Sequence, residues 1–302
     1  MRGASDFRRG RAVFRGRATG ISTDTGIKTM RDILVLSQTA GSFGSEVDVA
    51  AQLGAVLHAQ LTGLFVIEPY VAPPSYAPTI IGLLEQQASE LRAQAIGAAE
   101  EFTRFAHKRG CRTAGWQVGN GPLLETVAQM ACWHDMIVVP RDDAFPLGGV
   151  STIGRLLLGL RMPTLVVPAS HRGPLPFERV AIATNGSFES VRALRAAIPL
   201  IAAAASVVLF SSETHARSLV SAEPGAAVFS ASAYLARHGF TVDERSLPAG
   251  VSGDELVDAA AEANADLLVM GAYSRSRVSE RILGGATRSA LERCPMALFM
   301  TH

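Results

Sequence analysis

Glycines gather near the end of the chain, where a backbone could approach an anion. An apolar run over 267–270 stops at Gly271, and the pair Gly284-Gly285 precedes a segment of helical character. Glycine has no Cβ, so its amide can come close to an oxyanion. A helix beginning near Gly284 would direct free N–H groups and a partial positive charge at the same point. The chemistry that these residues could perform is therefore phosphate binding.

Positive charge accompanies these glycines, at Arg275, Arg277, Arg281 and Arg288. A guanidinium can bind a phosphate through two parallel hydrogen bonds. The alternative is that the glycines only let a helix pack tightly on the sheet and that the arginines form a solvated face. Arg275 and Arg277 fit the solvated face better, whereas either role fits Arg288.

Familiar catalytic motifs are missing from the sequence. Neither lysine, Lys28 or Lys108, follows a GxxxxG run, and no GxGxxG or GxSxG motif follows an expected strand. Such a chain lacks an organised set of acids, bases or metal ligands, which argues against efficient catalysis. The three cysteines are widely spaced and predict reduced, mostly buried thiols rather than disulfides or a zinc site.

The charge of the chain is unevenly distributed. Residues 1–29 contain seven basic and two acidic residues, although the whole chain has a net charge of +1, so the remainder is net negative. This balance argues against nucleic-acid binding by the folded part. We expect 1–29 to be a disordered basic extension. Without an apolar run of membrane-spanning length or a secretory signal, we expect no membrane association and a cytoplasmic location.

The elements that would position the glycine-rich loop occur twice along the 302 residues, a length that suits two domains. Three pairs of segments carry the repeat: 32–37 with 179–184, 134–140 with 265–271, and 162–168 with 294–300. The first copy is longer, and its surplus falls near a proline-rich stretch at 69–78 that we expect to be a loop or lid.

Each copy predicts alternating strands and helices, which is typical of a doubly wound parallel sheet in an α/β protein. Expected strands lie near 32–37, 61–67, 113–118, 135–140, 163–168, 178–184, 206–211, 240–246, 266–271 and 295–300. Expected helices lie near 44–59, 80–109, 121–133, 152–160, 188–204, 225–238, 252–264 and 283–293. We place the domain boundaries at 30–169 and 177–302, with 170–176 as linker.

The stretches VAIATNGSFESVRALRAAIPLI (180–201) and ADLLVMGAYSRSRVSERILGGATRSALERCP (265–295) resemble the universal stress proteins with two UspA-type domains in one chain. The resemblance covers roughly 30–302. It implies two Rossmann-like, five-stranded domains of the adenine nucleotide α-hydrolase type, paired through their last strands as an internal pseudodimer. A single continuous sheet would contradict the two-copy interpretation.

Nucleotide-binding members of this family carry a loop of the form glycine, two residues, glycine, nine residues, glycine, then serine or threonine. Gly271 and Gly284 match the first and third glycines. Ser274 stands in place of the second glycine, and Gly285 in place of the hydroxyl residue, which Thr287 could supply instead. Two of the four fixed positions therefore depart from the motif.

The resemblance also implies two adenine contacts. Asn185 occupies the position of an acidic residue in the binders, and its amide can donate and accept a hydrogen bond. Backbone groups near Ser211 would form the other contact. The alternative for Asn185 is a turn that caps the following helix without any ligand.

The first copy departs further from the motif. Gln38 stands where Asn185 stands in the second copy, Pro140 replaces the leading glycine, and Asp142-Asp143 bring negative charge to the phosphate position. We interpret its site as degenerate and empty.

Three functions remain open at this point. The first is a non-catalytic stress-response module that binds ATP or another adenine nucleotide in the C-terminal domain, with Mg²⁺ if nucleotide is bound, and acts through protein partners. The second is a weak ATPase, and the third is a scaffold without ligand. The chain could be a monomeric pseudodimer or a homodimer. An anion site in the C-terminal copy requires Asn185 and Gly284 to face one shared cleft.

Overall fold

The computed structural model describes residues 30–69, 78–142, 144, 148–212, 230–248, 251–272 and 285–302. The expected extension 1–29, and most of the proline-rich stretch, lie outside these residues. The N-terminal half contains β1 (Asp32–Leu36), α1 (Ser45–Leu57), β2 (Gln60–Ile67), α2 (Pro78–Gly97), α3 (Ala99–Lys108), β3 (Ala114–Asn120), α4 (Leu123–Ala131), β4 (Met136–Arg141), α5 (Val150–Leu160) and β5 (Thr164–Pro168). The C-terminal half contains β6 (Arg179–Thr184), α6 (Phe188–Ile201), β7 (Ser206–Ser212), α7 (Ala231–Arg237), β8 (Val242–Leu247), α8 (Gly253–Glu262), β9 (Leu267–Gly271), α9 (Gly285–Arg293) and β10 (Ala297–Thr301).

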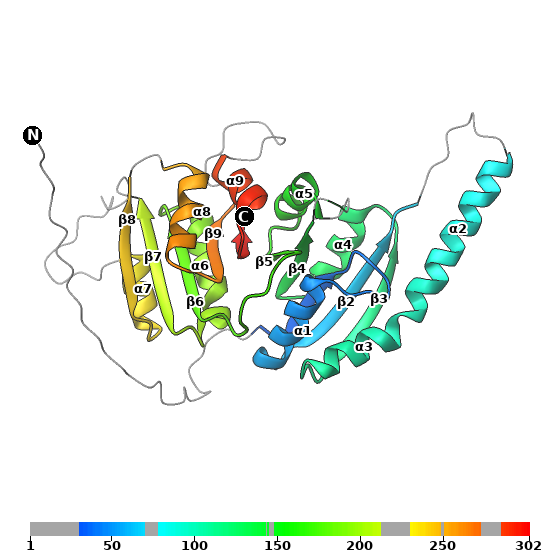
Figure 1. Ribbon diagram of the computed structural model, residues 1–302, viewed down its shortest axis with the longest axis horizontal. Helices are drawn as coiled ribbons and strands as arrows, with labels where there is room; N and C mark the ends of the chain where they lie inside the picture. Colours follow the sequence, from blue (N-terminus) through cyan, green and yellow to red (C-terminus); the bar gives the residue numbers. More distant parts are fainter. Residues whose placement is uncertain are drawn as a thin grey trace, which may run out of the picture.

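The strands form one sheet with the order β3-β2-β1-β4-β5-β10-β9-β6-β7-β8 (Figure 1). Strands within each half are parallel, whereas β5 and β10 are antiparallel, with Leu165 opposite Phe299. The pairing of the last strands, which the resemblance implied, is confirmed by the hydrogen bonds between β5 and β10. These bonds make the sheet continuous, so the expectation that one continuous sheet would exclude two copies is wrong. The two-copy interpretation nevertheless stands, because both halves repeat the same strand order and the direction reverses only at this junction.

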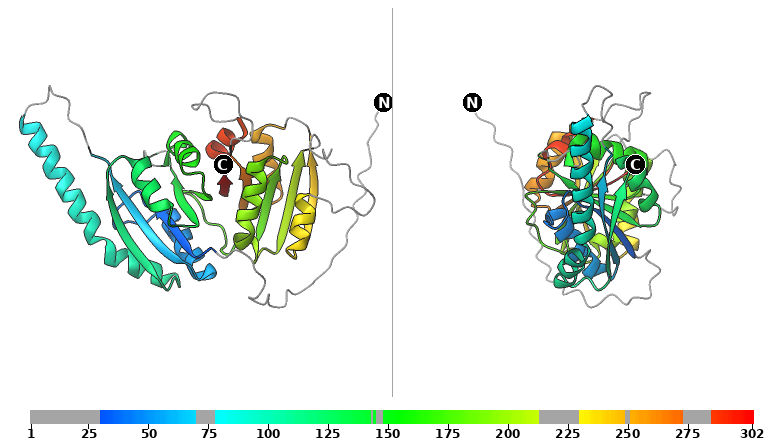
Figure 2. Two further views of the ribbon diagram at one scale, coloured as in Figure 1. Left: turned by 180° about the vertical axis from the view of Figure 1, so that it is seen from behind. Right: turned by 90° about the vertical axis from the view of Figure 1, so that its right-hand side faces the viewer.

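Helices cover both faces of the sheet (Figures 1 and 2). On one face, α1, α3, α6 and α7 bury their apolar side chains, and on the other face α4, α5, α8 and α9 do so. Four strands near the centre, β4, β5, β9 and β10, are buried almost throughout their length. Strands covered on both faces read as continuous apolar runs, which is why the sequence showed them clearly.

An aspartate at the same place in each copy ties two neighbouring strands together. Asp135 Oδ2 accepts a hydrogen bond from the N–H of Arg31 at 2.8 Å, just before β1. Asp266 Oδ2 accepts one from the N–H of Glu178 at 2.9 Å, just before β6. Each carboxylate satisfies backbone donors at the start of a buried strand, where an unpaired N–H would be costly.

One expected helix is wrong in detail. The helix predicted over 80–109 is divided at Ala98 into α2 and α3. Hydrogen bonds from Ala98 N to Gln94 O and from Phe102 N to Ala98 O still cross the division. Gly110 ends α3 with φ +89°, as expected for a glycine that terminates a helix. No helix in the described part of the chain is long and apolar enough to cross a membrane.

A histidine is buried in the segment that joins β5 to β6. His171 is 8% exposed, and its Nε2 has no hydrogen-bond partner within the described residues. Burial lowers the pKa of His171, and the charge of Arg172 lowers it further, whereas Asp266 and Asp48 act in the opposite direction. The folded state therefore disfavours the imidazolium, and the unfolded chain binds more protons just below the ordinary pKa.

We expect the free energy of unfolding to fall as the pH is lowered through about 6.5, where unfolded histidine becomes protonated. His171→Gln should reduce this dependence, because glutamine does not titrate. Denaturant titrations at a series of pH values between about 5.5 and 7.5 measure the slope of the free energy of unfolding against pH. His107→Gln, at an exposed site on α3, is the matched control. Equal slopes for the unmutated protein and both variants would exclude His171 as the source.

Candidate functional site

The strand order of the C-terminal half has a switch point between β6 and β9, where successive strands change from one side of β6 to the other. From β6 the chain proceeds outward to β7 and β8, and then returns to β9 and β10 on the other side. In open α/β sheets, ligands bind in the crevice beyond the carboxyl ends of the strands at such a point. The register places Thr184 of β6 opposite Ser211 of β7, and Gly271 of β9 opposite Thr301 of β10. Ser211 and Gly271 therefore lie at one edge, on either side of β6.

Asn185 forms a tight turn directly after β6. Its Oδ1 accepts a hydrogen bond from the N–H of Ser187 at 3.1 Å, and Ser187 Oγ accepts one from the N–H of Ser190 at 3.2 Å. The second bond caps the N-terminus of α6. These are the contacts of the capping turn that the sequence allowed as an alternative, and they hold Asn185 at the carboxyl end of β6.

Gly271 is required by packing. A Cβ at this position would lie 2.5 Å from the backbone nitrogen of Ser190 and 2.7 Å from the carbonyl carbon of Glu189. The end of β9 thus approaches the first turn of α6 so closely that a side chain has no room. This close packing explains the glycine without a ligand.

The N-terminal turn of α9 faces the same edge. Since β10 begins at Ala297, soon after α9 ends at Arg293, the N-terminus of α9 lies toward the carboxyl ends of the strands. A Cβ at Gly285 would contact no atom of another described residue within 4 Å, so the described part of this turn is open. Thr287 is 3% exposed. The backbone of this turn, rather than the Thr287 hydroxyl, is therefore the accessible group.

Arg288 lies on the outer side of α9. Its Nε donates to Glu292 Oε1 at 2.7 Å, and its side chain is 64% exposed. This pairing fits the solvated face better than a phosphate contact. Ser274, Gly284 and the other three arginines of the loop lie outside the described residues.

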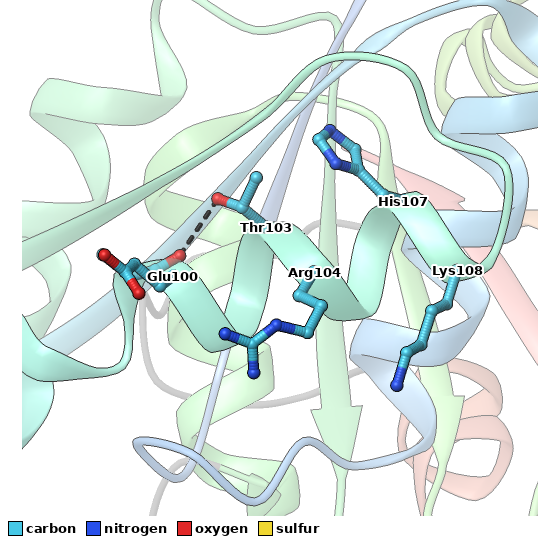
Figure 3. A pocket seen from close by; sticks show the side chains of 6 residues that line it. Glu100, Thr103, Arg104, His107 and Lys108 are labelled. Carbon is cyan, nitrogen blue, oxygen red and sulfur yellow. Dashed lines mark hydrogen bonds between the residues drawn. The ribbon is translucent and has the colours of Figure 1, made fainter.

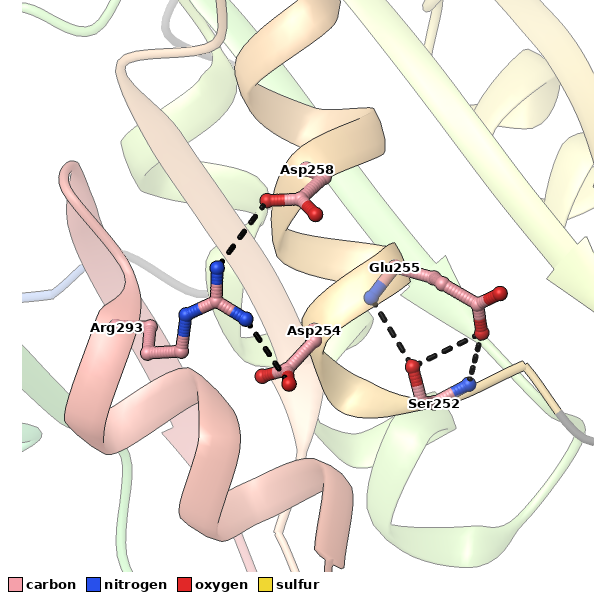
Figure 4. A network of polar contacts seen from close by, with 5 residues as sticks. All are labelled: Ser252, Asp254, Glu255, Asp258 and Arg293. Atoms are coloured by element: carbon pink, nitrogen blue, oxygen red, sulfur yellow. Dashed lines mark hydrogen bonds and ion pairs between the residues drawn. The ribbon is translucent and has the colours of Figure 1, made fainter.

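Packing against α8 positions α9. A Cβ at Gly253 would lie 2.5 Å from Ala286 Cα, so the first turns of the two helices are in close contact. At the other end of α9, Arg293 pairs with Asp254 at 2.9 Å and lies 3.9 Å from Asp258 (Figure 4). These pairs are about half exposed and contribute little individually. The close helix contact is therefore the stronger constraint.

Arg141 of the N-terminal half caps the C-terminus of α9. Its guanidinium donates to the carbonyl oxygen of Leu291 at 3.1 Å and also to those of Ala290 and Cys294. A cation at this end complements the partial negative charge of the helix and satisfies unpaired carbonyl groups. The sequence analysis missed this residue. Its only signal was an arginine directly after a buried strand, which does not indicate a contact about 150 residues away.

The equivalent crevice of the N-terminal half is filled. A Cβ at Gly148 would lie 2.5 Å from Asp142 N and 2.6 Å from Gln38 Nε2. Glu46 is buried beneath them, and burial raises its pKa, with a further rise from Asp142 and an opposing effect of backbone N–H groups. Negative charge and a closed backbone make this location unsuitable for phosphate. Asp143 lies outside the described residues.

Two cavities formed by described residues lie elsewhere. One of about 650 Å³ follows the outer side of α3, where Arg104, His107 and Lys108 lie in a row (Figure 3). The other, of about 660 Å³, lies beside α6 and includes Arg192 of this helix and Arg161, which follows α5. Neither includes a described residue that the sequence assigned to nucleotide. Among the described residues, no group of three or more histidines, cysteines, aspartates and glutamates could hold a metal ion.

Comparisons with known proteins identify the C-terminal half. A model of the universal stress protein family matches residues 176–302. This half belongs to the universal stress protein family. A universal stress protein from Archaeoglobus fulgidus DSM 4304 superimposes with a TM-score of 0.63 at 17% identity, covering 89% of this chain and 94% of that chain.

Other solved structures agree on the fold. A functionally unknown protein from Pseudomonas aeruginosa PAO1 gives a TM-score of 0.56 at 15% identity over 89% of this chain and 92% of that chain. No curated protein matches the sequence. Because these structures cover both halves, the chain is a tandem of two domains with the universal stress protein fold, as the resemblance implied.

Proposed function

We propose that the C-terminal half of this universal stress protein binds ATP or another adenine nucleotide without catalysing its turnover efficiently. The observation that supports this most directly is the shared edge at which Asn185, Ser211 and Gly271 lie, with the open N-terminus of α9 facing it. Small residues and the N–H groups of a helix N-terminus at a switch point suit a phosphate ester.

Each part of the nucleotide has a proposed contact. Asn185 and backbone groups near Ser211 would recognise adenine, and the backbone N–H groups from Gly285 onward would hold phosphate. Arg288 contributes little in this proposal, because Glu292 engages its guanidinium. Mg²⁺ binds mainly through phosphates and water in such sites, so it would arrive with the nucleotide.

The N-terminal half serves as a structural partner in this proposal. Residues 30–169 and 177–302 are the two domains, joined by 170–176. The filled crevice around Gln38 explains why only one half would take nucleotide. Arg141 of the N-terminal half also stabilises α9 from across the β5–β10 junction, and α9 is the helix that the ligand would contact.

A charge placed at Gly285 tests the proposal. Millimolar ATP should raise the melting temperature of the unmutated protein, because a ligand that binds only the folded state stabilises it. Gly285→Asp should abolish this rise by repelling phosphate. Its own melting temperature without ligand should not decrease, because a Cβ meets nothing there and an acidic residue suits a helix N-terminus. Gly285→Ala, which adds no charge, is the matched control and should retain the rise.

Two alternative functions have distinct outcomes. Absence of any shift with the unmutated protein would contradict nucleotide binding and support a scaffold without ligand. Phosphate release above that of heat-inactivated protein, lost in Gly285→Asp, would instead show a weak ATPase. Mass spectrometry of protein purified without added ligand would show whether adenine nucleotide is already bound.

A further inference from the structure

Helix α2 projects away from the rest of the molecule. It extends beyond the edge of the sheet in both long views (Figures 1 and 2). Eight large hydrophobic side chains are exposed in the described part of the chain, and four of them belong to this one helix: Ile80, Leu83, Leu91 and Ile96. An isolated helix of this length is only marginally stable in water unless it packs against another surface. The projecting turns of α2 therefore present an unpartnered apolar surface.

The base of α2 is firmly attached to the sheet. Trp116 Nε1 of β3 donates to the carbonyl oxygen of Ala95 at 2.7 Å. Ala95, Ala98 and Phe102 are buried, and Phe102 packs on Trp116 with ring centroids 5.0 Å apart. Because helical hydrogen bonds cross the division at Ala98, α2 continues the direction of α3 as a stiff extension.

One apolar stripe runs along both helices. Its members alternate at spacings of three and four residues: Ile81, Leu84, Ala88, Leu91, Ala95, Ala98 and Phe102. This is the repeat of a helix that packs along a second helix. The C-terminal part of the stripe is buried on the sheet, whereas the N-terminal part, with Leu91 at 39% exposure, continues past it. The stripe from Ile81 to Leu91 thus has the pattern of a helix interface, but it packs on no second helix among the residues that the structure describes.

Charged residues beside the stripe favour a second copy of α2 as its partner. Glu85 and Arg92 follow Leu84 and Leu91, so both lie along the same border of the stripe. They are seven residues apart, which is too far for a pair within one helix. When a second α2 lies antiparallel with Ala88 near the centre, Glu85 of each copy faces Arg92 of the other. A parallel arrangement would leave both charges without an opposite.

We propose that α2 is a self-association surface, and that two copies of the chain pair through antiparallel α2 helices. The small side chain of Ala88 lets the two helices approach closely at the centre, and the leucines on either side fill the contact. The internal β5–β10 junction already occupies the central strand edges of the two halves, so this contact would join two complete molecules.

Sedimentation velocity of the full chain over about 5–200 µM tests the proposal. The unmutated protein should shift from monomer toward dimer as its concentration rises. Replacing both leucines, Leu84→Gln with Leu91→Gln, should raise the dissociation constant of the dimer by at least about tenfold. Each copy would lose two leucines that the dimer contact buries. Ile96→Gln is the matched control, because it removes an exposed apolar side chain from another side of α2. Circular dichroism of each variant checks that the helix content is retained.

Charge reversal tests the antiparallel arrangement. Glu85→Arg and Arg92→Glu should each weaken the dimer, because each places like charges opposite one another. The double variant restores opposite charges and should recover the dimer. A monomer at every concentration would overturn the proposal, as would binding to phospholipid vesicles by a chain that remains monomeric. Failure of the double variant to recover would overturn the antiparallel pairing.

Discussion

Replacing Gly271 with alanine is expected to lower the free energy of unfolding by about 2–3 kcal/mol, at the upper end of the usual cost of overpacking. The new Cβ would lie 2.5 Å from Ser190 N and 2.7 Å from Glu189 C. Both contacts are backbone atoms in the first turn of a helix, which cannot rotate away as a side chain would. The end of β9 and the N-terminus of α6 must therefore separate. Denaturant titration of the full chain measures the loss.

The same substitution is expected to remove the stabilisation by ATP. Separation of β9 from α6 would shift the carboxyl end of β9, beside which the proposed ligand would lie. Gly285→Ala is the control, because its Cβ meets no atom within 4 Å and should change the free energy of unfolding only slightly. A Gly271→Ala protein as stable as Gly285→Ala would show that this close approach is not a constraint on the fold.

Replacing Arg141 with methionine is expected to cost about 2 kcal/mol, in the range of hydrogen bonds made by a charged group. Methionine keeps much of the aliphatic length but leaves the carbonyl groups of Leu291 and Cys294 without this donor. It also removes the positive charge at the C-terminus of α9. Hydrogen exchange should become faster in α9 and change little in α4, which lies farther from the junction.

Arg155→Met provides the comparison for Arg141→Met. Arg155 is an exposed residue of α5, so its loss should change the free energy of unfolding by no more than about 0.5 kcal/mol. If both variants had equal stability, the capping bonds of Arg141 would make no net contribution. If Arg141→Met showed faster hydrogen exchange in α9 together with weaker stabilisation by ATP, the N-terminal half would contribute to the proposed nucleotide site.

The central strands were predictable because burial on both faces leaves a simple signature. Runs such as 267–270 are wholly apolar and end at glycine, and their recurrence at 136–139 revealed the repeat. The division of the long helix at Ala98 was not predictable, because alanine favours helix and the hydrogen bonds continue across it. The pairing of β5 with β10 leaves no local pattern in the sequence, and only the resemblance to two-domain universal stress proteins implied it.

The candidate site was predictable only in part. The sequence indicated which residues follow β6, β7 and β9, since strand ends in a parallel sheet share one edge. It did not indicate that Gly271 contacts the backbone of α6, or that Glu292 engages Arg288, because both depend on how helices pack. Arg141 shows the same limit, since its partners belong to the other half of the chain.

The antiparallel junction of β5 and β10 has a consequence for evolution and regulation. Because the two halves run in opposite directions, their crevices open at opposite margins of the sheet, and a small molecule in one cannot touch the other. One margin can therefore lose its pocket through local changes, as around Gln38, while the other is left unaltered. One connection between the two margins is the contact of Arg141, at the end of β4, with the C-terminus of α9, whose N-terminus lies toward the other margin.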